Sequence, residues 1–306
     1  MSKECNVLLL GDRDCRRTFI KSMQIAHSGG FTSEERRNYR EVVVSNIVCV
    51  MEAAKRHAKI LSQEIEKIQA GDRKITIDGA AAVQGLWEDK ELVRRFLTET
   101  GGLADSYFVE EILRIARPDY LPTDADILKL RSVAPRKAGI QEFTFEMGSL
   151  SLHIFDISCQ RSERRKWIHH FENTISIVYC VDISQYDERV VEDSNEATLT
   201  EGLMLFGSVI NSRWFSRVSI ILLLCNIGHF KEKLRSKPLV NYFPDYSGRS
   251  DFGKASKYRL WWFNQVNRSH LNLYPHLCEP SDVSNMRLVL SAVKETVLHN
   301  ATRAFI

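Results

Sequence analysis

The sequence predicts an α/β protein that carries an all-helical insert. Apolar, β-branched runs at residues 6–10, 175–182 and 218–225 alternate with segments of helical periodicity. This alternation indicates a sheet with helices on both faces. Between Gly30 and Leu130 only helical patterns stand out. The predicted domains are a discontinuous α/β domain, residues 1–28 and 129–306, and a helical domain, residues 29–128.

Composition favours a globular protein. The chain has 306 residues, of which 44% are hydrophobic and 26% charged, with a net charge of +3. A nucleic-acid binder would usually be more basic, so we expect no nucleic-acid partner. The seven cysteines form no C-x-x-C pair and no zinc spacing. No run approaches the ~20 apolar residues of a membrane span. We therefore expect a cytoplasmic protein without an integral membrane segment, with partners as the route to any peripheral position on a membrane.

The chain opens with a strand, a loop and a helix. Residues 6–10 (NVLLL) form a continuous apolar run that ends at Gly11, as in a buried parallel strand. We expect a loop over residues 12–16 and a helix over residues 17–27. Gly29-Gly30 then breaks the helical pattern.

The insert begins with one long amphipathic helix. Apolar residues recur at steps of three and four from Val43 to Ile68. Further helices are expected over residues 80–87, 88–100 and 106–117.

Strands return in the last part of the chain. Gly148-Ser149 between the runs 142–147 and 150–156 predicts a hairpin. The apolar runs 175–182 and 218–225 are two more strands, and residues 271–277 are a weak one. Helices are expected over residues 162–171, 194–211 and 254–267. Ser281 or Asp282 is expected to cap a last helix.

The first loop resembles a degenerate phosphate loop. The pattern G-x-x-x-x-G-K-[ST] falls on residues 11–18, where Gly11 and Thr18 fit. Arg16 replaces the second glycine and Arg17 replaces the lysine. Taken alone, this stretch favours an ordinary turn.

The segment of residues 155–172, FDISCQRSERRKWIHHFE, resembles the switch II region of heterotrimeric G-protein α subunits, normally written DVGGQRSERKKWIHCFE. The resemblance continues at MQIAH followed by GGF (residues 23–31) and at RIARPDYLPT (residues 114–123). It covers nearly the whole chain. It implies a Ras-like P-loop GTPase domain with an inserted all-α helical domain.

Several family residues are altered. The switch II pattern D-x-x-G-Q keeps Asp156, which orders magnesium through water, and Gln160, which orients the attacking water. Ser158 and Cys159 replace both glycines. In the first switch, Arg131 is the counterpart of the catalytic arginine, and Lys137 stands where a threonine binds magnesium.

The base-reading motifs are altered as well. The family's N-K-x-D aligns with residues 225–228, so Gly228 replaces the aspartate that pairs with guanine. The T-C-A-T loop becomes residues 278–281. The resemblance thus implies a degenerate nucleotide site. Its expected residues are Gly11, Asp14, Arg16, Arg17, Thr18, Ser158, Cys225, Gly228 and Cys278, with Arg131 and Gln160 as a vestigial catalytic pair and Thr18 and Asp156 as a weak magnesium site.

Each replacement has a physical cost. Phosphate-loop glycines let backbone N–H groups close around phosphate, and Arg16 places a long side chain there. The Arg17 guanidinium cannot act as a compact ammonium. We therefore expect no tightly bound cofactor, with GTP, GDP and Mg²⁺ implied by the resemblance only. Two alternatives stay open: Arg13, Arg16 and Arg17 could bind an anion in another geometry, and Thr18 and Asp156 could bond to nearby loops instead of magnesium.

The resemblance also implies a partner-binding surface at switch II and the helix that follows it. Its expected residues are Arg161, Arg164, Lys166, Trp167, Phe171, Trp214 and Phe215. We expect the two tryptophans to be partly exposed and the two phenylalanines to be more buried. The family's N-terminal helix, which holds the βγ dimer, has no counterpart here, so we expect no stable βγ complex.

Two functions fit this pattern. The first is a signalling protein that binds effectors or regulators through switch II, with GTP hydrolysis weak or absent (a pseudo-GTPase). The second is an unconventional, slow GTPase in a receptor pathway. Cysteines 15, 159, 225 and 278 fall on the nucleotide motifs, where they are either redox-active or small fillers of a cavity.

Overall fold

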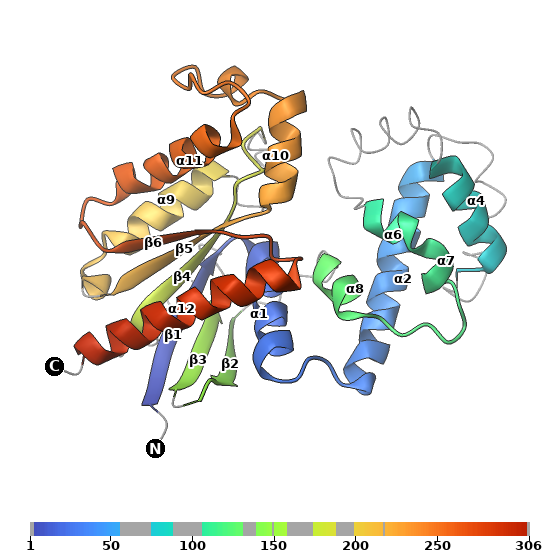
Figure 1. Ribbon diagram of the computed structural model, residues 1–306, viewed down its shortest axis with the longest axis horizontal. Coiled ribbons are helices and arrows are strands. Elements are labelled where there is room, and N and C mark those ends of the chain that lie inside the picture. Colours follow the sequence, from blue (N-terminus) through green and yellow to red (C-terminus); the bar gives the residue numbers. More distant parts are fainter. Residues whose placement is uncertain are drawn as a thin grey trace. The chain divides into compact units, whose positions relative to one another are not determined.

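The computed structural model describes residues 3–55, 75–87, 106–130, 139–148, 150–157, 174–187, 199–216 and 218–304. The chain divides into two compact units, one of Met1–Gly29 with Arg136–Ile306 and one of Gly30–Pro135. The first unit holds the sheet, and the second is helical in its described residues (Figure 1).

In the described residues, six strands form one sheet in the order β2-β3-β1-β4-β5-β6. The strands are β1 (Lys3–Gly11), β2 (Ile140–Glu146), β3 (Leu150–Ile157), β4 (Thr174–Asp182), β5 (Ser219–Cys225) and β6 (Leu273–Leu277). The β2–β3 pair is the antiparallel hairpin that Gly148 predicted, and the other pairs are parallel. Since parallel strands all point the same way, their carboxyl ends gather at one edge.

The central strands are apolar on both faces, because helices cover both faces. Along β1, Val7 and Leu9 pack in one core, and Leu8 and Leu10 pack in the other. Helices α1 (Arg13–His27) and α12 (Val283–Ala304) cover the first face (Figure 1). The second face is covered by α9 (Leu199–Ile210), α10 (Ile227–Ser236) and α11 (Phe252–Val266), with the short helices η2 (Arg213–Phe215) and η3 (Leu239–Asn241) beside them.

The helical unit contains α2 (Ser33–Lys55), α4 (Ile77–Trp87), α6 (Ser106–Glu110), α7 (Ile112–Ile115) and α8 (Asp124–Lys129). Its core joins Val43 and Ile47 of α2 to Phe108, Ile112 and Ile115 of the later helices. The helix expected over residues 106–117 is interrupted at Glu111, whose backbone leaves the helical region. The helix expected over residues 88–100 lies outside the described residues.

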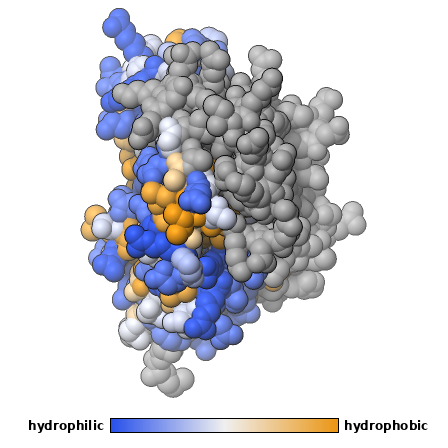
Figure 2. Space-filling model, turned by 90° about the vertical axis from the view of Figure 1, so that its right-hand side faces the viewer, coloured by the Kyte–Doolittle hydropathy of each residue, from blue (hydrophilic) through white to orange (hydrophobic). Residues whose placement is uncertain are grey.

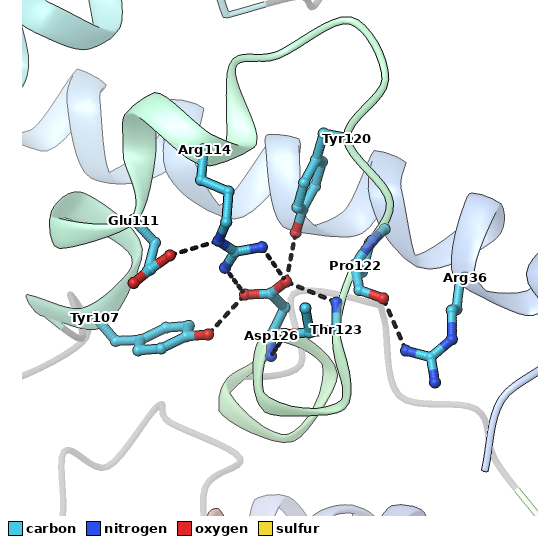
Figure 3. A network of polar contacts seen from close by, with 8 residues as sticks. All are labelled: Arg36, Tyr107, Glu111, Arg114, Tyr120, Pro122, Thr123 and Asp126. Carbon is cyan, nitrogen blue, oxygen red and sulfur yellow. Dashed lines mark hydrogen bonds and ion pairs between the residues drawn. The ribbon is translucent and has the colours of Figure 1, made fainter. Parts of the chain in front are cut away.

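A buried carboxylate organises one end of this unit (Figure 3). Asp126 accepts hydrogen bonds from both terminal nitrogens of Arg114, at 2.6 and 3.0 Å, and from the hydroxyls of Tyr107 and Tyr120. The backbone N–H of Thr123 donates to it as well, which completes a capping box at the start of α8. Because its lone pairs are satisfied, this charge can remain fully buried.

In the view of Figure 2 the described surface is mostly hydrophilic, and its most prominent cluster of apolar side chains lies near the middle. Ile77 and Leu113 are among the exposed apolar residues of the helical unit. Across the described part of the chain, no helix combines the length and apolar character that crossing a bilayer needs.

Helices α10 and α1 differ from the sequence-based expectations. Helix α10 was not predicted, because its ten residues include only three large apolar ones, Ile227, Phe230 and Leu234, of which the last two are buried. Helix α1 begins at Arg13, so the loop predicted over residues 12–16 is wrong. The reason is Asp12, whose side chain caps the helix.

Candidate functional site

The candidate site lies at the edge where the parallel strands end. In open α/β sheets this edge is where ligands bind. Here β1 ends at Gly11, β3 at Ile157, β4 at Asp182 and β5 at Cys225. The loop that starts at Cys278, after β6, joins them, since the Cys278 N–H donates to the carbonyl of Leu224.

At the position of the phosphate loop, the chain turns directly into a helix. The Asp12 carboxylate accepts the N–H of Cys15 at 2.9 Å, and the Asp12 carbonyl accepts the N–H of Arg16 at 3.0 Å. The first turn of α1 thus uses a carboxylate of the chain itself, where a phosphate loop presents N–H groups to a ligand. Gly11 is still required, because a Cβ there would lie 2.0 Å from the carbonyl oxygen of Cys180.

This carboxylate makes the phosphate position acidic. Burial and the neighbouring Asp182 raise the pKa of Asp12 to about 6. The group is therefore mostly ionised at neutral pH, where it would repel a phosphate. Asp182 itself accepts hydrogen bonds from Ser184 and from the side-chain amide of Asn226, at 2.6 Å for the latter.

The side chain of Arg16 points into the protein interior. It is buried, forms an ion pair with Asp156, and donates to the carbonyl of Ile157 at 2.7 Å. Burial raises the pKa of Asp156, and the attraction of Arg16 and Arg17 opposes that rise. In the family pattern Asp156 orders magnesium. Here a guanidinium of the chain occupies the place next to this carboxylate, so the residues present do not fit a magnesium ion in the family's arrangement.

The other predicted residues of this region also have partners within the chain. The Thr18 hydroxyl donates to the carbonyl of Asp14 at 2.9 Å, one turn earlier in α1. Asp14 is exposed in the first turn of the helix, and Arg17 is half-buried near Arg13. Thr18 thus bonds to the backbone of its own helix, and Asp156 pairs with the side chain of Arg16.

On the base side, a glutamate of the loop after β6 contacts the loop that lost its aspartate. Asn226 adopts the left-handed conformation (φ 61°) and starts α10. The N–H of Gly228 donates to Glu279 Oε2 at 3.0 Å, and Ser281 donates to Glu279 Oε1 at 3.0 Å. Sequence reasoning missed Glu279. The signal was present, because an acidic residue is lost at position 228 and one is gained in the loop of residues 278–281.

The described cysteines of this edge are all buried. The Sγ atoms of Cys225 and Cys278 are 3.3 Å apart, and Cys15 and Cys180 are buried close to Cys225. Burial raises the pKa of Cys225 and of Cys180, which keeps both thiols protonated at neutral pH. No group of side chains in the described ranges has the arrangement of a metal site. Cys180 was not among the cysteines singled out from the sequence.

Of the predicted partner surface, the structure describes two residues. Trp214 is 46% exposed, with the guanidinium of Arg213 over its ring, and Phe215 is 1% exposed. This split was predicted. The other site residues from the sequence lie outside the described residues: Arg131, Lys137, Ser158, Cys159, Gln160, Arg161, Arg164, Lys166, Trp167 and Phe171.

Comparison with known proteins identifies the family. Residues 1–297 match the family described as G-protein alpha subunit. The chain is 45% identical to the guanine nucleotide-binding protein alpha-3 subunit of Neurospora crassa, over 99% of this chain and 90% of that protein. It is 43% identical to the protein of the same name in Mycosarcoma maydis, with coverage of 98% and 90%. It is 39% identical to the guanine nucleotide-binding protein alpha-2 subunit of Saccharomyces cerevisiae, with coverage of 98% and 72%.

The family match extends over both units of the fold, and the relatives align along almost the whole chain. The alternation of strands and helices, the antiparallel hairpin and the helical insert agree with the expectation drawn from the switch II resemblance. The chain therefore belongs to the family of G-protein alpha subunits.

Proposed function

We propose that this protein is a G-protein α-subunit-like signalling protein with impaired guanine-nucleotide binding. It acts as an interaction module through its switch II surface and the helix that follows it, without a GTP-hydrolysis cycle. The observation that carries the proposal is the pairing of Arg16 with Asp156, which puts a cation of the chain beside the carboxylate that orders magnesium in the family.

Two further contacts support the proposal. Asp12 caps α1 where the family's phosphate loop meets its ligand, and Glu279 binds the N–H of Gly228 where the family's base-reading aspartate stands. At each of the three places a side chain of the protein binds at a position that contacts nucleotide or metal in the family. A ligand would have to displace these contacts before making its own.

The expected loss of nucleotide-binding free energy is large enough to favour one of the two functions, the interaction module or the slow GTPase. A hydrogen bond to a charged group contributes about 1.5–3 kcal/mol, and each factor of ten in affinity corresponds to about 1.4 kcal/mol. The loss of several such contacts lowers affinity by several powers of ten. This estimate favours the interaction module over the slow GTPase.

The proposed output surface contains Trp214, which is exposed, together with the switch II residues that the resemblance implies. An exposed tryptophan with an arginine over its ring has the composition of an interface anchor. This surface does not include the nucleotide contacts, so it can persist after they are lost.

The test is a calorimetric titration of the protein with GTPγS and Mg²⁺. We expect no binding in the micromolar range. A variant that restores the family pattern (Arg16→Gly, Arg17→Lys, Lys137→Thr, Gly228→Asp) serves as the comparison and should bind more tightly than the natural chain. Magnesium-dependent binding of GTPγS by the natural chain below one micromolar would contradict the proposal and favour the slow GTPase.

A further inference from the structure

A buried arginine in α11 has two guanidinium nitrogens without a polar partner. The Arg259 side chain is 1% exposed, and its Nε and Nη1 atoms make no hydrogen bond within the described residues. Burial lowers the pKa of Arg259 to about 9, so the group keeps its charge at neutral pH. A buried charge without a partner costs several kcal/mol. An anion that reached this guanidinium would offset that cost.

Aromatic rings surround the guanidinium. The Arg259 Cζ atom lies 5.4 Å from the ring centroids of both Phe243 and Trp262. These two rings meet edge to face at 4.7 Å, and Tyr258 stacks on Trp261 with centroids 5.8 Å apart. We call Phe243, Tyr258, Trp261 and Trp262 the aromatic platform.

The platform opens to solvent. Trp261 is 51% exposed, and Tyr258 and Trp262 are half-buried. The third nitrogen of Arg259, Nη2, is not among the enclosed atoms without a partner, although the residue as a whole is only 1% exposed. The guanidinium thus lies beneath exposed aromatic surface.

The charged side chains of α11, the helix that carries most of the platform, are all positive. Lys257 and Lys254 are exposed one and two turns before Trp261, and the fifteen residues of α11, which follow the N-cap Asp251, include no Asp or Glu. Positive charge at the rim attracts an acidic partner and speeds its encounter with the protein.

We propose that the aromatic platform and Arg259 form a docking surface for an acidic protein segment. A carboxylate of the segment pairs with Arg259, and a neighbouring apolar side chain packs on Trp261. Tryptophan, tyrosine and arginine are the residues that most often dominate binding energy at interfaces, and a charge pair in a desolvated setting is stronger than one in water. The surface does not use the nucleotide contacts or Trp214, so it stands apart from the function proposed above.

The test is selection of a displayed library of random twelve-residue peptides on the full chain. We expect enriched peptides in which Asp or Glu adjoins an apolar residue. Their synthetic forms should bind Arg259→Leu and Trp261→Ala at least about tenfold more weakly, the size of effect typical of an interface anchor. Leu288→Ala is the control, because it removes an exposed apolar side chain of α12 that belongs to neither proposed surface, and it should bind like the natural chain.

Thermal unfolding separates docking from structure. Arg259→Leu should melt at or above the temperature of the natural chain, because it replaces a buried, partly unpaired charge by an apolar side chain. The proposal is overturned if no acidic sequence is enriched, if Arg259→Leu and Trp261→Ala bind the peptides like the natural chain, or if Leu288→Ala weakens binding equally. Selective binding to phosphatidylserine vesicles without peptide binding would also overturn it, in favour of a membrane surface.

Discussion

The guanidinium of Arg16, in the first helix, pairs with the carboxylate of Asp156, which lies 140 residues later at the end of β3. Both side chains are largely buried, and Arg16 also donates to the carbonyl of Ile157. The pair connects helix α1 with the end of strand β3, where the switch II segment begins.

The first prediction concerns this pair. Arg16→Ala should lower the free energy of unfolding by about 3–5 kcal/mol, because it leaves a buried carboxylate without its cation. Urea unfolding followed by circular dichroism measures this change. The double variant Arg16→Leu with Asp156→Leu should recover most of the loss. A single variant as stable as the natural chain would show that the pair does not hold the two elements together.

The second prediction is that stability does not depend on ligands. A ligand at one hundred times its Kd raises the free energy of unfolding by about 2.7 kcal/mol. If the chain's own side chains fill the site, added EDTA or added GTPγS with Mg²⁺ should leave the melting temperature unchanged. Differential scanning fluorimetry is sufficient, with the restored variant described above as the control. A fall of several degrees on chelation would contradict this expectation.

The third prediction follows from Asp126 in the helical unit. Burial alone would raise the pKa of this carboxyl, but the bonds from Arg114, Thr123 and Tyr107 outweigh it and lower the pKa to about 2. A lowered pKa in the folded state means stability that is present above about pH 4 and is lost as the pH falls towards 2. The Asp126→Asn variant should therefore be less stable than the natural chain at pH 7, and the difference should shrink below pH 4.

The control for that prediction is Asp124→Asn. Asp124 lies in the same short helix and binds Arg36, but its side chain is 36% exposed, whereas that of Asp126 is fully buried. Its effect at pH 7 should be the smaller one, since exposed ion pairs contribute at most about 1 kcal/mol. Equal effects of the two substitutions in urea unfolding would contradict the role given to Asp126.

The fourth prediction concerns thiols. Of the seven cysteines, Cys5, Cys15, Cys180, Cys225 and Cys278 are buried in the described structure. Because a protonated, inaccessible thiol reacts slowly, at most two cysteines should react quickly with Ellman's reagent in the folded protein, and the rest should react only on unfolding. A third fast-reacting thiol at neutral pH would reopen the redox interpretation of the pocket.

The sequence could predict the parts of the fold that depend on local patterns. The runs 175–182 and 218–225 became β4 and β5 because their residues are apolar in succession, as both faces of the sheet require. Helix α10 could not be predicted in this way, since its two buried residues, Phe230 and Leu234, give too short a periodic signal.

Less of the candidate site than of the fold could be predicted from the sequence. Arg16 was expected to disturb the phosphate loop, but its partner is distant in the chain and no local pattern joins it to Asp156. Asp12 does carry a local signal, as an aspartate that precedes a helix, but the phosphate-loop alignment favoured a loop there. Glu279 acquires its role only when β5 and β6 bring its loop to the start of α10.

A glycine is required at position 11 for a reason that is independent of nucleotide binding. A side chain there would collide with the carbonyl oxygen of Cys180 whether or not a phosphate ever binds. A deep mutational scan would therefore find position 11 intolerant while the exposed position 14 accepts many residues. Retention of this glycine in a sequence alignment would record the packing of two backbones, and it could not be counted as selection for nucleotide.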